Sequence, residues 1–180
     1  MNNRFEIRGG TVVIFLRRRN EDRLETYVDI EDLHKVKSFR NSWCPTWSPS
    51  TKSFYSLGNM VYGPGCSTTI LLHRWLVDCP KGFDVDHINH NTLDNRRMNL
   101  RIVSRSENSQ NRKGANSNSA SGVRGVYWDL ERRLWRAEIR IKGRKLHLGR
   151  FTELSTAQEA VTLARLEFMP FSPETKEGIS

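Results

Sequence analysis

Nine consecutive residues, 114–122, are all small or polar, and they divide the chain into parts that must fold around separate cores. A segment of this composition buries too little apolar surface to offset the entropy that it would lose on ordering. We therefore predict a flexible linker over 114–122. In a chain of 180 residues the parts on either side are short, so each needs compact packing or support from a neighbour.

Positive charge is concentrated in one part of the chain. Residues 101–150 contain 13 Lys and Arg against 4 Asp and Glu, an excess that equals the net charge of +9 of the whole chain. Such a basic block is typical of proteins that bind nucleic acid, because their cations release the counterions condensed on phosphates. A solvated basic face is the alternative that charge alone leaves open.

Several classes of protein are excluded or disfavoured by simple patterns. No apolar run approaches the ~20 residues of a membrane-spanning helix, and the N-terminal residues lack the pattern of a secretory signal. The three cysteines, Cys44, Cys66 and Cys79, form no C-x-x-C pair, which argues against a disulfide framework and a four-cysteine zinc site. We expect a cytoplasmic protein with free thiols and no membrane partner.

Residues 1–72 are predicted to form a β-rich segment. Apolar, β-branched runs bounded by turn residues indicate strands at 12–16, 54–57 and 68–72. The stretch 43–49 contains two prolines and is expected to be a loop. Its residues Trp43 and Trp47 are interpreted as lids on the core, and stacking on nucleic-acid bases is the alternative.

Residues 73–113 form a second unit that is richer in Asn, Asp, His and Arg. Alternating apolar and polar residues predict a strand over 83–88, and a turn-rich loop and a second strand at 100–103 follow. Ser104 and Glu107 have the spacing of a capping box, so a helix should begin there and run towards Arg112. The predicted order is therefore strand, loop, strand, helix.

Residues 123–168 are predicted to form a sheet covered by one helix. Apolar and basic side chains alternate over 135–142, and strands before and after it complete a three-stranded antiparallel meander. Ser155 and Gln158 predict a second capping box. The helix that follows has one apolar face for the sheet, made of Ala157, Ala160, Val161, Ala164 and Phe168. The opposite sheet face then displays Arg136, Arg140, Lys145 and His147, with Arg124 a possible addition.

Four polar residues of the second unit suit the hydrolysis of a phosphodiester. A neutral His87 can deprotonate water, and a hard divalent cation can stabilise the leaving oxygen. Asp86 and the amide oxygen of Asn108 are the ligand types that magnesium prefers. Asn99 can accept from one imidazole N–H and so select the tautomer. Capping of turns is the alternative role for each Asn and Asp.

The same residues carry a family resemblance. The segment VDHINHNTLDNRRMNLRIVSRSEN, from Val85 to Asn108, and the preceding LHRW closely resemble the HNH endonuclease family, which has a ββα-metal fold. The resemblance covers about residues 70–112. It implies Asp86 and Asn108 as metal ligands for Mg²⁺ or Mn²⁺, His87 as general base and Asn99 as the residue that orients it. Many members hold a structural zinc with four cysteines, which this sequence lacks, so no structural zinc is expected.

Other residues near this motif have weaker signals. His73 is interpreted mainly as a core hydrogen-bonding residue near the site, and His90 as either a phosphate contact or a solvent-facing side chain. Three arginines, Arg96, Arg97 and Arg101, are predicted to contact phosphates, which positions DNA without reading its sequence. A solvated arginine is the alternative for each.

The third part has a resemblance of its own. Val123 to Val126, Trp128, 137–140, Leu148-Gly149 and 157–160 look like the DNA-binding domain of plant ethylene-response factors. That family lays a three-stranded sheet in the major groove with a helix behind it. The resemblance covers 122–168 and departs from the family pattern between Val126 and Ala137. It implies that the groove-facing residues are Arg124, Glu138, Arg140, Lys145 and His147.

Together these patterns predict an α+β protein with five segments: a β-rich segment (1–72), an HNH nuclease core (73–113), a linker (114–122), a sheet-plus-helix DNA-binding domain (123–168) and a tail (169–180). The combination resembles the mobile HNH endonucleases of bacteriophages and introns, which implies the cytoplasm of a bacterial host. We predict a metal-dependent endonuclease of double-stranded DNA, a monomer or weak dimer. A non-catalytic DNA-binding regulator and an RNA-binding protein are the alternatives.

Overall fold

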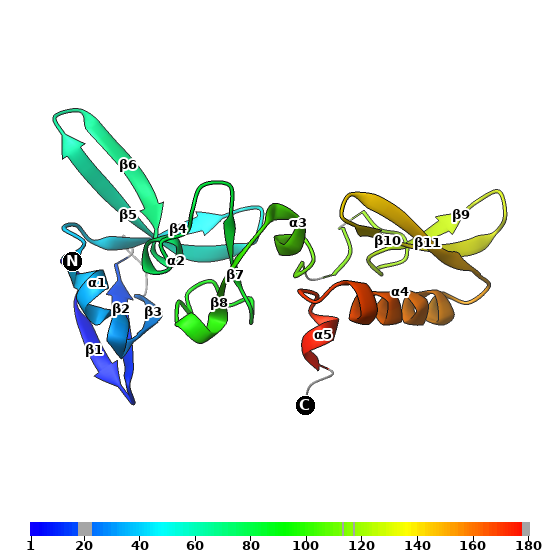
Figure 1. Cartoon of the computed structure of the whole chain (residues 1–180), viewed down its shortest axis with the longest axis horizontal. Coiled ribbons are helices and arrows are strands. Elements are labelled where there is room, and N and C mark those ends of the chain that lie inside the picture. The colour runs from blue at the N-terminus through cyan, green and yellow to red at the C-terminus, as the bar shows by residue number, and fades with distance from the viewer. Residues whose placement is uncertain (18–22, 113, 117, 178–180) are drawn as a thin grey trace. The chain divides into compact units, whose positions relative to one another are not determined.

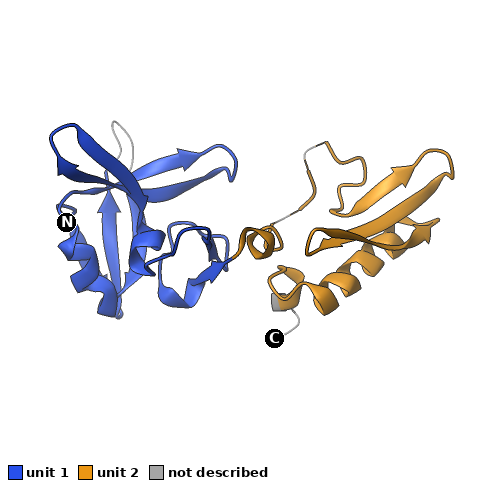
Figure 2. Ribbon diagram, turned by 45° about the horizontal axis from the view of Figure 1, so that its top comes forward, with its two compact units in different colours: residues 1–103 blue, residues 104–180 orange. Residues whose placement is uncertain are grey.

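The computed structural model describes residues 1–17, 23–112, 114–116 and 118–177. The fold is α+β, as predicted, and consists of short helices and several small antiparallel sheets (Figure 1). The chain divides into two compact units, residues 1–103 and 104–180 (Figure 2). The first unit therefore contains the strands of the predicted nuclease core, and the second contains its helix.

The first sheet of unit 1 is an antiparallel meander of three strands. Its strands are β1 (Phe5–Arg8), β2 (Thr11–Leu16) and β3 (Leu24–Asp29), in the order β1-β2-β3. The β1–β2 turn contains Gly9 and Gly10 at φ of +53° and +81°, a region that glycine enters without steric cost. Strand β2 is buried along most of its length, so it forms the centre of the core.

A second antiparallel sheet follows two short helices, η1 (Ile30–Asp32) and α1 (Leu33–Ser38). Its strands are β4 (Trp43–Ser48), β5 (Ser53–Gly63) and β6 (Cys66–Leu71), in that order. The loop predicted over 43–49 is therefore wrong. Because β4 is an edge strand, it accommodates Pro45, which lacks the N–H that a central strand must donate.

The core of unit 1 connects the N-terminal segment with the start of the predicted nuclease core. Helix α2 (Leu72–Leu76) begins where the last predicted strand was expected to end, and its Leu72 and Leu76 are fully buried. They pack in one cluster with apolar residues of β2, β3 and α1. Trp43 is also fully buried there and stacks on Phe39, which confirms its predicted place in the core, whereas Trp47 is half exposed.

The two strands of the predicted nuclease core pair as an antiparallel hairpin. Strand β7 (Asp84–His87) pairs with β8 (Leu100–Val103), and the helix η2 (Arg97–Asn99) precedes β8. The long connection between the strands is attached to the first sheet. Tyr27 of β3 donates its N–H to the carbonyl of Leu93, and Asn95 donates its N–H to the carbonyl of Tyr27. The loop thus adds a short parallel bridge to the edge strand β3.

Unit 2 opens with α3 (Arg105–Asn108), which is shorter than the helix predicted to run towards Arg112. Its capping box is confirmed. The Ser104 hydroxyl accepts from the Glu107 N–H, and the Glu107 carboxylate accepts from the Ser104 N–H. The two bonds satisfy backbone donors that the first turn of a helix leaves unpaired.

The three-stranded sheet of unit 2 is confirmed. It consists of β9 (Val126–Asp129), β10 (Leu134–Ile141) and β11 (Arg144–Phe151), with β10 in the centre. The chain enters β9 through Gly125, whose φ is +87°. A Cβ atom there would lie 2.6 Å from the Glu138 carbonyl oxygen, so the backbones approach too closely for any other residue.

Helix α4 (Leu154–Phe168) covers the apolar face of this sheet and is followed by the short α5 (Glu174–Glu177). Ala157, Val161 and Ala164 pack on Val126, Ala137 and Ile139. The predicted Ser155 cap is wrong, because the N-cap is Glu153 and Leu154, packed against the core, already lies in the helix. Phe168 is 42% exposed, so it does not belong to the buried face.

No helix of the described segments has the length and apolar character to cross a membrane.

Candidate nuclease site

His87 ends strand β7 and lies in the interior of unit 1, with 5% of its surface exposed. Its Nε2 atom lies 3.2 Å from Oδ1 of Asn95, which comes from the loop between β7 and β8. The other end of the Asn95 amide donates from Nδ2 to the hydroxyl of Thr26 in β3 at 2.7 Å. The imidazole is therefore connected through one amide to the N-terminal sheet.

Two other rings surround His87. The His73 imidazole of α2 meets it edge-on, with ring centroids 4.9 Å apart, and Tyr55 of β5 lies against both histidines. Burial lowers the pKa of His87, although the hydrogen bond to Asn95 and the charges of Asp86 and Asp94 oppose this effect. His87 is thus held in the neutral form that a general base requires.

His73 is still more strongly affected by its surroundings. Burial, followed by the charges of His87 and Arg74, lowers the pKa of His73 to about 3. The contact with His87 agrees with the predicted position of His73 near the site. The neutral ring packs edge-on against Tyr55 and His87.

This lowered pKa leads to a prediction about stability. Because unfolded His73 takes up a proton near pH 6.5 and the folded ring does not, stability should fall as the pH drops below 6.5. Between pH 6.5 and pH 5 the wild type should lose about 1.6 kcal/mol more unfolding free energy than His73→Gln. Urea unfolding of both proteins at each pH measures the difference, and parallel curves for the two would contradict it.

Asp86, the predicted metal ligand, is 7% exposed and faces Arg101 across the hairpin. Its Oδ2 accepts from Nε of Arg101 at 2.7 Å and lies 2.6 Å from Nη2 of the same residue. The buried carboxylate is therefore balanced by a cation. Arg101 was predicted to contact phosphate. In the structure it pairs with Asp86, the predicted metal ligand.

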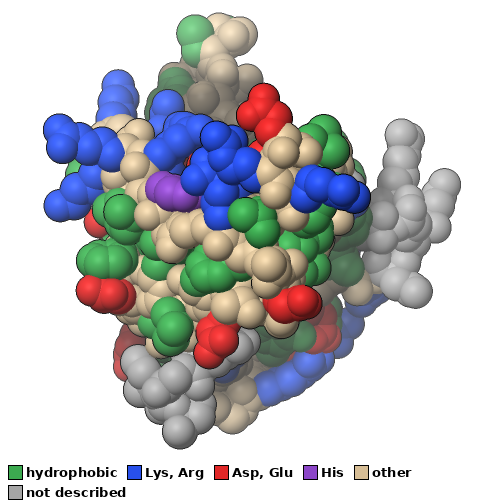
Figure 3. All heavy atoms as spheres, turned by 90° about the vertical axis from the view of Figure 1, so that its right-hand side faces the viewer, with side chains coloured by type: hydrophobic (Ala, Val, Ile, Leu, Met, Phe, Trp, Pro, Cys, Tyr) green, Lys and Arg blue, Asp and Glu red, His purple; other side chains and the backbone are tan. Residues whose placement is uncertain are grey.

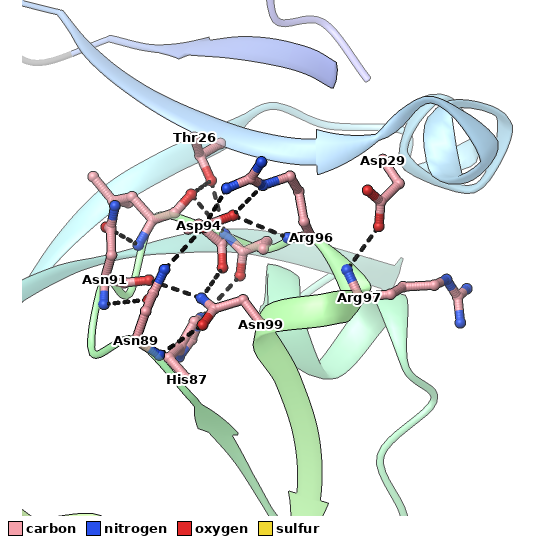
Figure 4. A network of polar contacts seen from close by, with 11 residues as sticks. Thr26, Asp29, His87, Asn89, Asn91, Asp94, Arg96, Arg97 and Asn99 are labelled. Atoms are coloured by element: carbon pink, nitrogen blue, oxygen red, sulfur yellow. Dashed lines mark hydrogen bonds and ion pairs between the residues drawn. The ribbon is translucent and has the colours of Figure 1, made fainter. Parts of the chain in front are cut away.

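Asn99, predicted to orient His87, lies elsewhere in the loop. Its Oδ1 accepts from the N–H of Asn89 at 2.8 Å, and its Nδ2 donates to the carbonyl of Asp94 at 2.7 Å. The predicted contact between Asn99 and the imidazole is therefore wrong, and Asn95 makes it instead. The reason is that Asn99 bonds across the loop to its backbone, which ties the two ends of the loop together (Figure 4).

The loop is further braced by ion pairs of Arg96 and Arg97. Arg96 binds both carboxylate oxygens of Asp94 at 2.8 Å. Arg97 binds both oxygens of the buried Asp32 at 2.9 and 2.6 Å, and its N–H donates to Asp29. The two guanidinium groups, predicted to contact phosphates, are thus engaged by carboxylates of unit 1.

His90 lies in the turn after β7 with a φ of +64° and donates its N–H to the His87 carbonyl.

Asn108, the second predicted ligand, is the last residue of α3 in unit 2, whereas Asp86 belongs to unit 1. A shared ion between them stays a prediction. In the described parts of the chain, no three His, Cys, Asp or Glu side chains gather into a group that could hold a metal ion.

The exposed face of the unit 2 sheet carries the predicted basic residues. Across the strands Arg136 faces Tyr127 and Arg150, Glu138 faces His147, and Arg140 faces Lys145. The half-buried Glu138 carboxylate lies 3.6 Å from both Arg136 and Lys145, so it spaces the cations. Lys and Arg side chains gather beside a histidine on one side of the face shown in Figure 3.

Arg124 does not present a free guanidinium group to this face. Its Nη1 donates to the carbonyls of Gln110 and Arg112 at 3.0 and 2.9 Å, and its Nη2 donates to the carbonyl of Ser109 at 2.8 Å. These acceptors follow α3 directly. Arg124 therefore does not have the groove-facing role that the resemblance implies. Its hydrogen bonds join the segment after α3 to the start of the sheet.

Two residues of the site were missed as individual candidates. Asn95 belongs to the Asp-Asn pair of the motif. The spacing of this pair supported the family resemblance of the loop, but no individual role was predicted for Asn95. Thr26 is one of the β-branched residues of an ordinary strand, and nothing in the sequence marks it as a partner of a loop 69 residues away from it.

Comparisons with known proteins agree with the motif. Residues 78–110 match the family model for HNH endonucleases. The chain is also 41% identical over 66 residues to Protein 3.8 of Escherichia phage T7, which is 37% of this chain and 54% of that protein. The chain thus matches about half the length of this curated relative. No solved structure matches the chain.

The family match confirms the predicted HNH resemblance for the segment that contains Asp86, His87, Asn95, Asn99 and Asn108. It ends at residue 110, so the resemblance of 122–168 to an ethylene-response-factor domain stays a prediction.

Proposed function

We propose that the protein is a metal-dependent endonuclease that hydrolyses phosphodiester bonds of double-stranded DNA. One observation carries the proposal: a buried imidazole, His87, is oriented by an amide and directly follows the buried Asp86 on β7, in a segment that matches HNH endonucleases. A purely DNA-binding protein has no need for a neutral, oriented imidazole, because contacts with the phosphate backbone are made mainly by cations and surface hydrogen-bond donors.

His87 is the proposed general base. Its lowered pKa keeps the ring unprotonated at neutral pH, so it can take a proton from water as the water attacks phosphorus. The bond to Asn95 restricts rotation of the ring, so that one nitrogen keeps a constant direction. The attacking water and the leaving 3′ oxygen must lie in line on opposite sides of the phosphorus.

The residues fit a divalent ion of the magnesium type. The Asp86 carboxylate is a hard oxygen donor that is already buried and oriented, and magnesium needs only one or two protein ligands besides water and substrate phosphate. Asp86 and Asn108 would hold Mg²⁺ or Mn²⁺, which when bound stabilises the negative charge on the leaving oxygen. The ion pair with Arg101 balances the charge of the Asp86 carboxylate.

Unit 2 is proposed to bind the duplex through the exposed face of its sheet. The excess positive charge of the chain falls within residues 101–150, and Arg140, Lys145 and His147 are exposed on β10 and β11. These cations suit the DNA backbone, and polar side chains among them suit contacts with base edges.

A plasmid assay tests the endonuclease. With Mg²⁺ the purified chain should convert supercoiled DNA to the relaxed or linear form, and EDTA should reduce the rate at least 1000-fold until excess Mg²⁺ restores it. The His87→Ala protein, purified in the same way, controls for a contaminating nuclease. Undiminished cleavage in EDTA, or intact plasmid with both Mg²⁺ and Mn²⁺, would contradict the proposal.

A further inference from the structure

Hydrogen bonds between three side chains connect the first sheet to His87. Thr26, Asn95 and His87 are 0%, 1% and 5% exposed. The Asn95 amide lies between the other two, 2.7 Å from the Thr26 hydroxyl and 3.2 Å from the imidazole. None of the three is on the surface, so solvent does not compete for these hydrogen bonds.

The direction of each hydrogen bond follows from a backbone carbonyl that can only accept. The Thr26 hydroxyl lies 2.7 Å from the carbonyl oxygen of Leu93, so its single proton is donated there. The hydroxyl oxygen can then only accept from Asn95, and the amide atom facing it must be the NH₂ group. That NH₂ group also lies 3.3 Å from the same carbonyl, a longer contact that favours the same orientation.

The orientation of the amide decides the state of the imidazole. With its NH₂ group facing Thr26 and Leu93, Asn95 presents Oδ1 to His87. Because this oxygen can only accept, Nε2 of His87 must carry the proton. The lone pair of the neutral ring is then on Nδ1.

We propose that Thr26 is a positioning residue of the nuclease site, because it fixes the Asn95 amide and through it the Nε2–H tautomer of His87. The catalytic consequence rests on the proposed function, in which Nδ1 of His87 takes the proton from water. The N-terminal sheet thereby contributes to a site whose motif lies wholly within residues 78–110.

The backbone offers a way to separate this role from simple support of the loop. Tyr27 and Asn95 hold the loop on β3 through two main-chain hydrogen bonds that do not involve the Thr26 side chain. Thr26→Val keeps the shape of the side chain and these bonds but removes the hydroxyl. The Asn95 NH₂ group then keeps only its longer, 3.3 Å contact with the Leu93 carbonyl. The preference for the native orientation is weaker, so a fraction of the molecules can turn the amide and present NH₂ to His87.

The first measurement is the tautomer, read from the ¹⁵N shifts of the His87 ring at a pH where it is neutral. We expect the wild type and Thr26→Ser to show Nε2–H, and Thr26→Val to show a substantial fraction of Nδ1–H. Thr92→Val is the matched control, since Thr92 donates from the same loop to the Phe54 carbonyl but does not touch Asn95. It should retain the wild-type tautomer.

The second measurement is single-turnover cleavage. Thr26→Val should lower the maximal single-turnover rate about 10- to 100-fold and leave unchanged the concentration that gives half of this rate, because losing an outer partner of a functional histidine typically has an effect of this size. Thr26→Ser should recover most of the rate. Thr92→Val should stay within about twofold of the wild type. If Thr26→Val does not fold, Thr26→Ala replaces it in both measurements. The tautomer of the wild type tests the proposal without any variant.

The outcomes distinguish this inference from the proposed function. An Nδ1–H tautomer in the wild type, or an unchanged tautomer in Thr26→Val, overturns the role of Thr26 whatever the cleavage rates are. An Nε2–H tautomer that is lost in Thr26→Val supports it even if no condition yields cleavage, and in that case only the nuclease assignment fails.

Discussion

Replacing His87 with alanine should lower the single-turnover rate of DNA cleavage about 1000-fold or more, while the affinity for DNA stays within about twofold. The change removes the proposed general base, so water must lose its proton without help. The ring is buried and has no direct role in the proposed binding face of unit 2, which is why affinity should persist. Cleavage of a labelled duplex and a binding titration in Ca²⁺ measure the two quantities.

Two controls make this result specific. His34→Ala removes an exposed imidazole whose Nδ1 lies 2.9 Å from the Glu31 carbonyl oxygen, and it should leave the cleavage rate unchanged. Imidazole added to His87→Ala should raise the cleavage rate of this variant about tenfold, because it can occupy the vacated space and act as a base. Full activity of His87→Ala, with its fold verified by circular dichroism, would remove His87 from the mechanism.

Neutralising three cations of the unit 2 sheet should weaken DNA binding about 100-fold at ~0.1 M salt. We expect this for the combined variant Arg136→Gln, Arg140→Gln and Lys145→Gln, whose residues lie on β10 and β11. Each lost phosphate contact should also reduce the slope of log K against log salt by about 0.9, so the triple variant should lose about 2.7. Fluorescence anisotropy over a range of salt concentrations gives both values.

A second triple variant separates location from total charge. Arg23→Gln, Arg40→Gln and Lys81→Gln remove the same charge from exposed positions of unit 1. This control should change affinity only a few-fold, because long-range attraction between exposed charges is screened at this salt concentration. Equal losses of affinity and slope in the two triple variants would show that the sheet of unit 2 is not the DNA-binding face.

The arginines of the motif show how far sequence reasoning reaches. Arg96, Arg97 and Arg101 all look like phosphate contacts when only their neighbours in sequence are known. In the fold each finds a carboxylate: Asp94 two residues away, Asp32 in the N-terminal segment and Asp86 on the paired strand. Each guanidinium group pairs with a buried carboxylate through two of its nitrogens, which gives these arginines a role in holding the loop and the site. Only the first of these partners is close enough in sequence to be foreseen.

The sequence by itself determined the local elements of this protein. Alternation of apolar and polar side chains predicted the hairpin of β7 and β8 and the sheet of unit 2, and the spacing of Ser104 and Glu107 predicted a cap that the structure contains. These features depend on residues a few positions apart, whose geometry is set by strand and helix periodicity. The Asp86-His87 pair was likewise visible, because the motif is contiguous.

Only the tertiary structure decided which residue orients His87. Asn95 and Asn99 lie four positions apart in a loop without regular periodicity, and both have the chemistry for the task. The choice came from β3, where Thr26 and Tyr27 bind the loop at Leu93 and Asn95 and turn one amide towards the imidazole. A hydrogen bond between residues 69 positions apart depends on how the sheet and the loop pack, and no local pattern records that packing.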